Sequence, residues 1–282
     1  MTASHQPPAT SHSPGEPIGL VAGSGRFPVL FAEAARARGL RVVAIGHRGD
    51  TDPSLANSVD RFHWVHLGQV GKMTRLFRGE SVSRAVMAGG IGKLSALVRA
   101  RPDWGGLAFA AKLRNLNDDH VLRTLADVFE QAGVRIEPST VFTPELLAPA
   151  GVLSQRQPSE SEQQDIAFGL EVARAVGKAD VGQTVVVEAR QVLAVEASEG
   201  TDPTITRGGD YGQGRAVVVK ISKPGQDLRF DLPAIGERTI AVMAAHGCKA
   251  LAVEAGRTLL LDGQAVLRAA DAAGIVVVGI AP

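Results

Sequence analysis

The feature that most restricts the fold is a strand, a glycine-rich turn, a helix and a second strand in direct succession. An apolar run, Ile18–Ala22, leads into the glycines of GSGRFP, and an alanine-rich helical pattern then ends at Gly39. A second apolar run, Arg41–Ile45, follows at once. Strands joined through a helix in this way are parallel and are connected by a right-handed crossover. The sequence therefore predicts a parallel α/β sheet in this part of the chain.

The second half of the chain has a different pattern. A break rich in proline and serine, LLAPAGVLSQRQPSESE, leads into a helix start in which Ser159 and Glu162 have the spacing of a capping box. Two apolar segments, TVVVEARQVLAVEA and RAVVVKIS, are so close in sequence that we expect antiparallel strands, and helices and strands alternate after them.

The 282 residues are enough for two domains. We expect residues 1–16 to be a disordered leader, because they are rich in proline, serine and threonine. Residues 17–152 are predicted to form an N-terminal Rossmann-like parallel α/β domain. Residues 153–282 are predicted to form a C-terminal α/β domain with a mixed sheet.

Charge and cysteine content exclude several classes of protein. Lys and Arg number 30 and Asp and Glu number 29, so the chain has no general attraction to nucleic acid. The single cysteine, Cys248, cannot form an internal disulfide and is typical of a reducing compartment. No apolar run approaches the roughly 18 residues of a membrane span. We therefore expect a soluble, cytoplasmic protein that does not bind nucleic acid.

Two glycine-rich turns are candidate binding elements. The first is Gly23, Ser24, Gly25, Arg26, Phe27 and Pro28; the second contains Gly89, Gly90 and Lys93. Glycine lets a backbone approach a phosphate, and a helix N-terminus presents free N–H groups to it. Pro28 stands where the dinucleotide fingerprint has its third glycine, and Lys93 is followed by Leu94, which rules out a P-loop. Both turns follow strands, so a parallel sheet would bring them to its ligand-binding edge; the alternative is a purely structural turn.

Charged residues gather in two further segments. In EASEGTDPTITRGG, Glu199, Asp202 and Arg207 share a loop that either binds a metal–diphosphate group or is an ordinary polar turn. In KPGQDLRFDL, apolar positions alternate with Asp227, Arg229 and Asp231, which predicts a half-buried strand with one charged face.

The Pro-Gly turn before that strand suits type II, which does not join a tight hairpin. We therefore expect a wider loop that leaves Lys223 and Gln226 able to reach a ligand. The alternative interpretation is a solvated sheet edge with ion pairs between its strands.

Four segments in this order, GLVAGSGRFP, AVMAGGIGK, EGTDPTITRGG and VVVKISKPGQDLRFDLPAIG, resemble the UDP-2,3-diacylglucosamine diphosphatases of the LpxI type. The resemblance implies a hydrolase that cleaves UDP-2,3-diacylglucosamine to UMP and 2,3-diacylglucosamine 1-phosphate, called lipid X, in lipid A biosynthesis. It also implies two domains that hold the ligand between them and a divalent cation, typically Mg²⁺. The substrate is a lipid-linked sugar nucleotide, so we expect transient contact with the inner membrane surface. A homodimer is compatible with the sequence.

The resemblance assigns roles to individual residues. By its place in KPGQD, Asp227 is the expected catalytic residue of a catalytic C-terminal domain, and the N-terminal domain is expected to bind substrate. The expected metal ligands are Asp227, Asp202, Glu199 and Asp231. The expected substrate-binding residues are Gly23–Pro28, Gly89, Gly90, Lys93, Thr201, Arg207, Lys223 and Gln226. The alternative function is a non-catalytic protein that binds a sugar nucleotide or a lipid; a nucleotide-dependent oxidoreductase is disfavoured because the dinucleotide fingerprint is incomplete.

Overall fold

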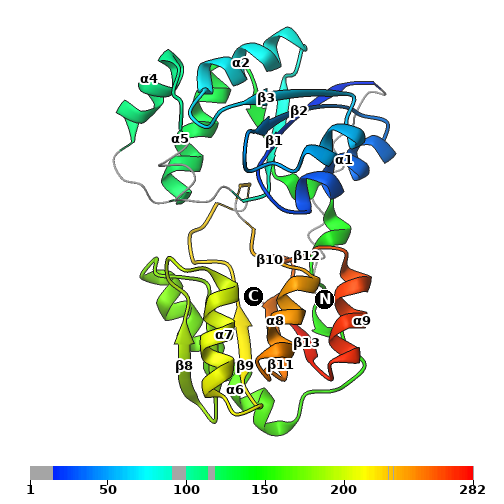
Figure 1. Ribbon diagram of the computed structural model, residues 1–282, viewed down its shortest axis with the longest axis vertical. Helices are drawn as coiled ribbons and strands as arrows, with labels where there is room; N and C mark the ends of the chain where they lie inside the picture. The colour runs from blue at the N-terminus through cyan, green and yellow to red at the C-terminus, as the bar shows by residue number, and fades with distance from the viewer. Residues whose placement is uncertain (1–14, 91–99, 114–117, 228, 231, 282) are drawn as a thin grey trace, which may run out of the picture. The chain divides into compact units, whose positions relative to one another are not determined.

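The computed structural model describes residues 15–90, 100–113, 118–227, 229–230 and 232–281, and the chain divides into two compact units (Figure 1). The first unit comprises Met1–Pro144 together with Asp227–Asp231, and the second comprises Glu145–Gln226 together with Leu232–Pro282. The predicted leader lies almost entirely outside the described residues. Each unit is an α/β structure, which confirms the predicted fold class.

The first unit is built on a parallel sheet. Its described strands run in the order β3-β2-β1-β4-β5, and every pairing among them is parallel. This is the order of the first five strands in doubly wound nucleotide-binding sheets. The elements are β1 (Pro17–Ala22), α1 (Phe27–Ala37), β2 (Arg41–His47), β3 (Arg61–Val65), α2 (Val70–Gly79), β4 (Arg84–Ala88), α4 (Trp104–Lys112), α5 (Asp118–Gln131) and β5 (Arg135–Ile136).

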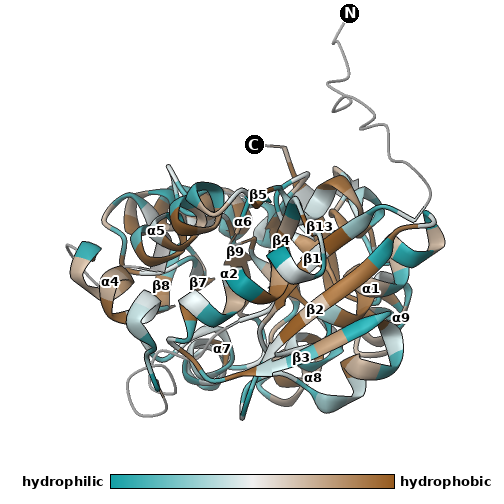
Figure 2. Ribbon diagram, turned by 90° about the horizontal axis from the view of Figure 1, so that it is seen from above, coloured by the Kyte–Doolittle hydropathy of each residue, from teal (hydrophilic) through white to brown (hydrophobic). Residues whose placement is uncertain are grey.

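Helices cover both faces of this sheet. Because strand side chains alternate between faces, Val21, Val43 and Ile45 point to one side, where they pack with residues of α2 and α5. Ile18 and Leu20 point to the other side, where α1 contacts β1, β2 and β4. In Figure 2 the inner strands β1 and β2 are mostly brown, whereas part of the edge strand β3 is teal. The burial of two apolar faces explains why the strands read as continuous apolar runs.

The second unit contains a mixed sheet in the order β6-β13-β11-β9-β7-β8. Strands β9, β11 and β13 are parallel, whereas β7 is antiparallel to β8 and β9 and β6 is antiparallel to β13. The elements are β6 (Gly151–Val152), α6 (Glu160–Lys178), β7 (Thr184–Glu188), β8 (Gln191–Val195), α7 (Thr201–Tyr211), β9 (Val217–Lys220), β10 (Ala234–Ile235), α8 (Glu237–Ala245), β11 (Ala250–Glu254), β12 (Leu259–Leu260), α9 (Gly263–Ala272) and β13 (Val276–Ile280).

Two apolar clusters stabilise this second sheet. Helix α6 packs Ile166 and Ala173 against one face, and α7, α8 and α9 pack against the other through residues such as Ile205, Met243 and Val266. The predicted capping box begins α6: the Ser159 hydroxyl accepts the N–H of Glu162, and the Glu162 carboxylate accepts the N–H of Ser159. Such a cap stabilises a helix by about 1 kcal/mol.

Local structure departs from expectation in three places. The first compact unit ends at Pro144 and not at 152, because Gly151–Val152 pair with β13 of the second unit. Asp202 and Arg207 lie on α7, so the expected loop is wrong. The expected strand is also wrong, because residues 229–230 form a turn in which the Phe230 N–H donates to the carbonyl of Asp227. The adjacent positions 228 and 231 lie outside the described residues.

Candidate functional site

The two glycine turns of the first unit meet at the carboxyl edge of its sheet. The Ser24 N–H donates to the Gly90 carbonyl at 2.7 Å, and the Gly90 N–H donates back to the Ser24 carbonyl at 3.2 Å. The Ser24 hydroxyl also donates to the Gly90 carbonyl, at 2.9 Å. The turns follow β1 and β4, which are adjacent in the sheet and mark the point where the strand order reverses. Ligands of parallel α/β sheets bind at this place.

Two of the glycines are required by this mutual packing. A Cβ on Gly23 would clash with the Gly90 carbonyl oxygen, and a Cβ on Gly89 would clash with the Ser24 carbonyl oxygen. Gly25 differs, because a Cβ there would meet open space, but its φ of +89° is one that other residues rarely adopt. The glycines therefore shape the turns first, and the shape leaves Ser24, Gly25 and Arg26 exposed.

The N-terminus of α1 begins directly at this exposed turn. No side chain caps it, and proline occupies one of its first positions. The N–H groups of Val29 and Leu30 donate to the Arg26 carbonyl, so it is chiefly the positive end of the helix dipole that suits an anion here. Phe27 and Pro28, which were predicted to bind substrate, are buried in the first turn of the helix. Lys93 lies outside the described residues.

A histidine that the sequence analysis did not single out holds the end of β1. His47 Nδ1 lies 3.1 Å from the Ala22 carbonyl, which also accepts the Thr51 hydroxyl at 2.6 Å. A carbonyl oxygen can only accept, so Nδ1 carries the proton and donates it to this bond. Burial lowers the pKa of His47, which keeps the imidazole uncharged at neutral pH. The two bonds fix the residue immediately before Gly23.

Asp227 begins a short stretch, Asp227–Asp231, that belongs to the first unit, although the segments before and after this stretch belong to the second. Its carboxylate accepts two N–H groups of the Arg229 guanidinium, at 2.9 and 3.1 Å, and the Arg229 backbone N–H at 3.1 Å. Arg123 of α5 lies 3.9 Å away. Phe230 packs into the apolar cluster of α2 and α5, and Arg229 lies 3.6 Å from Glu130. Asp227, Arg229 and Phe230 are thus attached to α5 and its apolar cluster.

These contacts set the charge of Asp227. Hydrogen bonds from the Arg229 side chain lower the pKa of Asp227 and outweigh the opposing effect of burial. The carboxylate is therefore ionised at neutral pH. An acid with a lowered pKa is a poor proton acceptor, so the geometry favours a role in binding a cation or orienting a group over a role as general base.

The Pro-Gly turn that precedes Asp227 has the predicted form, but its side chains are engaged. The Gln226 N–H donates to the Lys223 carbonyl at 3.0 Å, and Gly225 has a φ of +82°, as a type II turn requires. The Gln226 side-chain oxygen accepts the Lys223 N–H, and Lys223 Nζ pairs with Asp180 at 2.7 Å. Both side chains thus have partners within the second unit, and the prediction that they reach a ligand requires the release of these contacts.

Three buried polar residues, Thr184, Lys220 and Glu196, lie side by side at one edge of the second sheet. Thr184 of β7 is paired with Lys220 of β9, and its carbonyl accepts the Glu196 N–H that follows β8. Lys220 Nζ donates to the Thr201 hydroxyl at 3.0 Å and to the Ala234 carbonyl at 2.9 Å. The Thr201 hydroxyl in turn donates to Glu196 at 3.1 Å. Lys220 therefore ties the start of α7 to β10.

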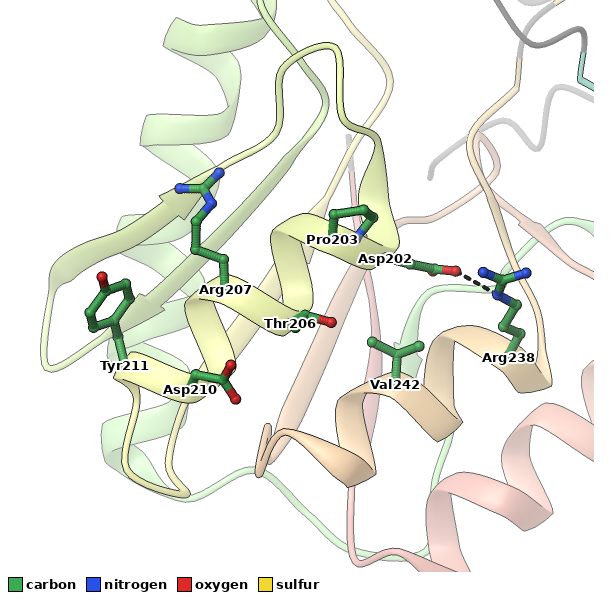
Figure 3. Close-up of a pocket in the computed structure, with 8 residues that line it drawn as sticks. All are labelled: Asp202, Pro203, Thr206, Arg207, Asp210, Tyr211, Arg238 and Val242. Atoms are coloured by element: carbon green, nitrogen blue, oxygen red, sulfur yellow. Dashed lines mark ion pairs between the residues drawn. The ribbon is translucent and has the colours of Figure 1, made fainter. Parts of the chain in front are cut away.

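A groove of about 860 Å³ lies between α7 and α8 on the second unit. Figure 3 shows Asp202 pointing from α7 toward Arg238 of α8, and their ion pair measures 2.7 Å. Arg207 points the other way and pairs with Glu199 at 2.7 Å. Both carboxylates that were predicted as metal ligands in this unit are thus paired with arginines.

The predicted cation ligands do not converge within either unit. Asp227, Glu199 and Asp202 are each bound by an arginine, and Asp231 lies outside the described residues. No three acidic, histidine or cysteine side chains of the described residues come together as a metal site. Asp227 belongs to one unit and Glu199 and Asp202 to the other. Within either unit, the described residues do not form a ready cation site.

The fold and the sheet edges described above define the class of this protein. It is a two-domain α/β protein: the first domain has a parallel sheet whose glycine turns meet where the strand order reverses, and the second has a mixed sheet. Two family models match almost the whole chain, the LpxI N-terminal domain at residues 17–146 and the LpxI C-terminal domain at residues 149–278. The chain belongs to the LpxI family, and it is an enzyme of the hydrolase class.

One relative is similar over nearly the full length. The UDP-2,3-diacylglucosamine pyrophosphatase LpxI of Caulobacter vibrioides is 38% identical over 280 residues, which cover 94% of this chain and 98% of the relative. Solved structures are much more distant. A biotin carboxylase domain from Hydrogenobacter thermophilus matches with a TM-score of 0.28 at 15% identity, covering 67% of this chain and 39% of that one. UDP-glucose 4-epimerase from Bifidobacterium longum matches with a TM-score of 0.27 at 12% identity, covering 50% and 42%. Similarity this low carries no functional argument.

Several residues that shape the site were not among those predicted from the sequence. Lys220 and Glu254 end buried strands, and Ser222 donates to Glu254 through both its N–H and its hydroxyl. The signal was present: each is a charged residue at the end of an apolar strand, as in VVVK and ALAVE. Arg123 and Arg238 gave no such signal, because an arginine on an amphipathic helix is ordinary.

Proposed function

We propose that this chain hydrolyses the diphosphate of UDP-2,3-diacylglucosamine, giving UMP and 2,3-diacylglucosamine 1-phosphate. The observation that carries the proposal is the full-length similarity to a relative named for this activity, with both LpxI domains present in order. The described geometry is compatible with it, because the first unit offers an exposed glycine turn at a sheet edge and an ionised aspartate.

In this proposal the GSGRFP turn binds the substrate. Ser24, Gly25 and Arg26 are exposed beside the uncapped N-terminus of α1, so backbone N–H groups and the Arg26 guanidinium can meet phosphate or sugar oxygens. Gly89 and Gly90 support the turn from β4. His47 acts through the Ala22 carbonyl and positions the turn without touching the ligand.

Asp227 is the proposed catalytic residue. Arg229 keeps it ionised and directs its carboxylate, so a fixed negative charge can hold a cation or orient the attacking water. Thr201 serves the fold through its bonds to Lys220 and Glu196, and it is not assigned to the substrate. Arg207 and Lys223 remain candidates for phosphate contact, subject to release from Glu199 and Asp180.

A divalent cation, Mg²⁺ or another, is also part of the proposal. It would neutralise the charge that repels a nucleophile from a diphosphate and would lower the pKa of bound water. Asp227, Glu199 and Asp202 are each paired with an arginine. Of the expected ligands we retain Asp227, because it is also the proposed catalytic residue.

The substrate carries two acyl chains, which supports the predicted contact with a membrane surface. Among the described residues, no helix combines the length and the apolarity needed to cross a bilayer. The homodimer and the cytoplasmic location remain predictions from the sequence.

The test is product formation with purified protein. UDP-2,3-diacylglucosamine dispersed in detergent is incubated with the chain and Mg²⁺, and released UMP is quantified by anion-exchange chromatography, while binding is followed in parallel on the Asp227→Ala variant. UMP that accumulates with time and enzyme concentration supports the hydrolase. Saturable binding without UMP would instead establish the second candidate, a non-catalytic sugar-nucleotide or lipid-binding protein.

A further inference from the structure

Helix α4 presents large apolar side chains to solvent. Trp104 is 88% exposed and Leu107 is 50% exposed, and three alanines of the same helix are also exposed. Large apolar residues on a helix ordinarily face the core, and tryptophan is seldom so open. The arrangement therefore calls for a physical reason.

The packing of α4 explains which side faces outward. A Cβ on Gly106 would clash with the Gly68 carbonyl oxygen, and a Cβ on Gly105 would lie 2.6 Å from the Gly71 Cα. The helix thus approaches α2 backbone to backbone, through its two glycines. Because the inner side accepts no side chain, Trp104 and Leu107 are held on the outer side.

A partly buried carboxylate keeps the helix in this orientation. Asp103 caps α4 by accepting the Gly106 N–H at 2.8 Å, and it also accepts the N–H groups of Gly71 at 3.1 Å and Lys72 at 2.7 Å at the start of α2. One side chain therefore joins the N-termini of both helices. The outward apolar face is a fixed feature of the first unit, because its support consists of backbone contacts and this cap.

Basic residues flank helix α4. Arg101 and Lys112 stand at the two ends of α4 and are exposed, and the Arg75 side chain on α2 is 71% exposed and lies 3.9 Å from Asp103. The carboxylate oxygens of Asp103 are already used by three N–H groups. Exposed cations around tryptophan and leucine match the chemistry of an anionic membrane surface, where aromatic rings lie at the headgroup level and basic side chains meet lipid phosphates.

We propose that α4, with Arg75 and Arg101, is the surface that docks this protein on anionic lipid bilayers. The inference rests on the proposed function, since a substrate with two acyl chains is held in a membrane. Trp104 and Leu107 enter the headgroup–acyl boundary, and the basic residues contact the phosphates. Each large apolar side chain is expected to strengthen binding to vesicles by about tenfold.

The experiment uses the fluorescence of Trp104. The chain has two tryptophans, so Trp64→Phe leaves Trp104 as the reporter. Its emission is expected to shift to shorter wavelength with vesicles of phosphatidylglycerol and phosphatidylethanolamine, and not with vesicles of phosphatidylcholine. In the otherwise unaltered chain, Trp104→Ser with Leu107→Ser should lower the affinity for the anionic vesicles, measured by sedimentation, by about a hundredfold. The matched control is Tyr211→Ser, an equally simple loss of an exposed aromatic on the second unit, which should sediment normally.

The outcomes separate this surface from the proposed function. Normal turnover of a short-chain, water-soluble substrate analogue by the double variant, with lost vesicle binding, supports the docking surface. Unchanged vesicle binding or an unshifted Trp104 emission overturns it. A wild-type dimer that the double variant converts to a monomer also overturns it, because α4 would then be an interface between copies. Vesicle binding by a wild-type chain that releases no UMP would support the surface and reject the hydrolase.

Discussion

Replacing Asp227 with alanine separates a catalytic carboxylate from a structural one. The side chain is 14% exposed and holds the Arg229 guanidinium with two hydrogen bonds and the Arg229 N–H with a third. Hydrogen bonds to charged groups contribute about 1.5–3 kcal/mol when buried. The Arg229 side chain is 38% exposed, so solvent screens part of this. We expect the free energy of unfolding to fall by about 1–2 kcal/mol, which leaves a folded protein.

The expected loss of rate is much larger than this loss of stability. Removing a group that orients water or holds a cation lowers kcat by about 10²–10⁴-fold. The matched control is Arg229→Gln, which breaks the same ion pair and leaves the carboxylate in place. It should lower stability by a similar amount and kcat by less than about tenfold. Initial rates of UMP release and denaturant unfolding on both variants make the comparison. Equal loss of kcat in the two variants would refute the reasoning, because Asp227 would then act only by holding Arg229.

The same pair predicts a dependence on pH. Arg229 lowers the pKa of Asp227 in the folded protein, so the stability from this pair is fully present above the unfolded pKa, about 3.9, and is lost as pH falls through the lower folded pKa. In Arg229→Gln the acidic limb of kcat should move to higher pH. An acidic limb at the same pH in wild type and variant would show that another group controls it.

Three further results are expected. Excess EDTA should abolish UMP release and added Mg²⁺ should restore it. Full activity in EDTA would show that the reaction needs no divalent cation. Gly25→Ala should lower the free energy of unfolding by about 1–2 kcal/mol through its positive φ and should weaken substrate binding measured by titration, whereas unchanged affinity would make the turn purely structural. Lys220→Met should lower the free energy of unfolding by about 1–3 kcal/mol in denaturant titrations, because Thr201 and the Ala234 carbonyl lose a buried donor. The matched control Lys249→Met, at an exposed position just before β11, should change stability little, and equal losses in both variants would contradict the role of Lys220.

Periodicity was sufficient to predict the sheets, because burial on two faces leaves continuous apolar runs and because Ser159 and Glu162 carry their helix signal locally. The glycine turns were also predictable in place, since parallel strands bring them to one edge. The reason why these turns need glycine could not be predicted from the sequence. Gly23 and Gly89 are required by contacts between turns that lie 66 residues apart, as the hydrogen bond from Ser24 to Gly90 shows.

The segment around Asp227 shows why the rest could not be predicted. Alternation of Phe230 with charged neighbours indicated a strand, but Phe230 packs with the α2 and α5 cluster of the first unit and the backbone turns to reach it. A periodic pattern reports that a side chain is buried and does not report which unit buries it. For a similar reason the ion pair of Asp202 was invisible in the sequence, since its partner Arg238 is far from it along the chain.

The most direct test of the central claim is a phosphorus NMR time course with the full chain and UDP-2,3-diacylglucosamine. We expect the two coupled diphosphate signals to disappear together and two phosphomonoester signals to replace them, one of UMP and one of the acylated sugar 1-phosphate. With Asp227→Ala the diphosphate signals should remain. Persistence of the diphosphate with wild-type protein, or its conversion to UDP and free sugar, would contradict the account.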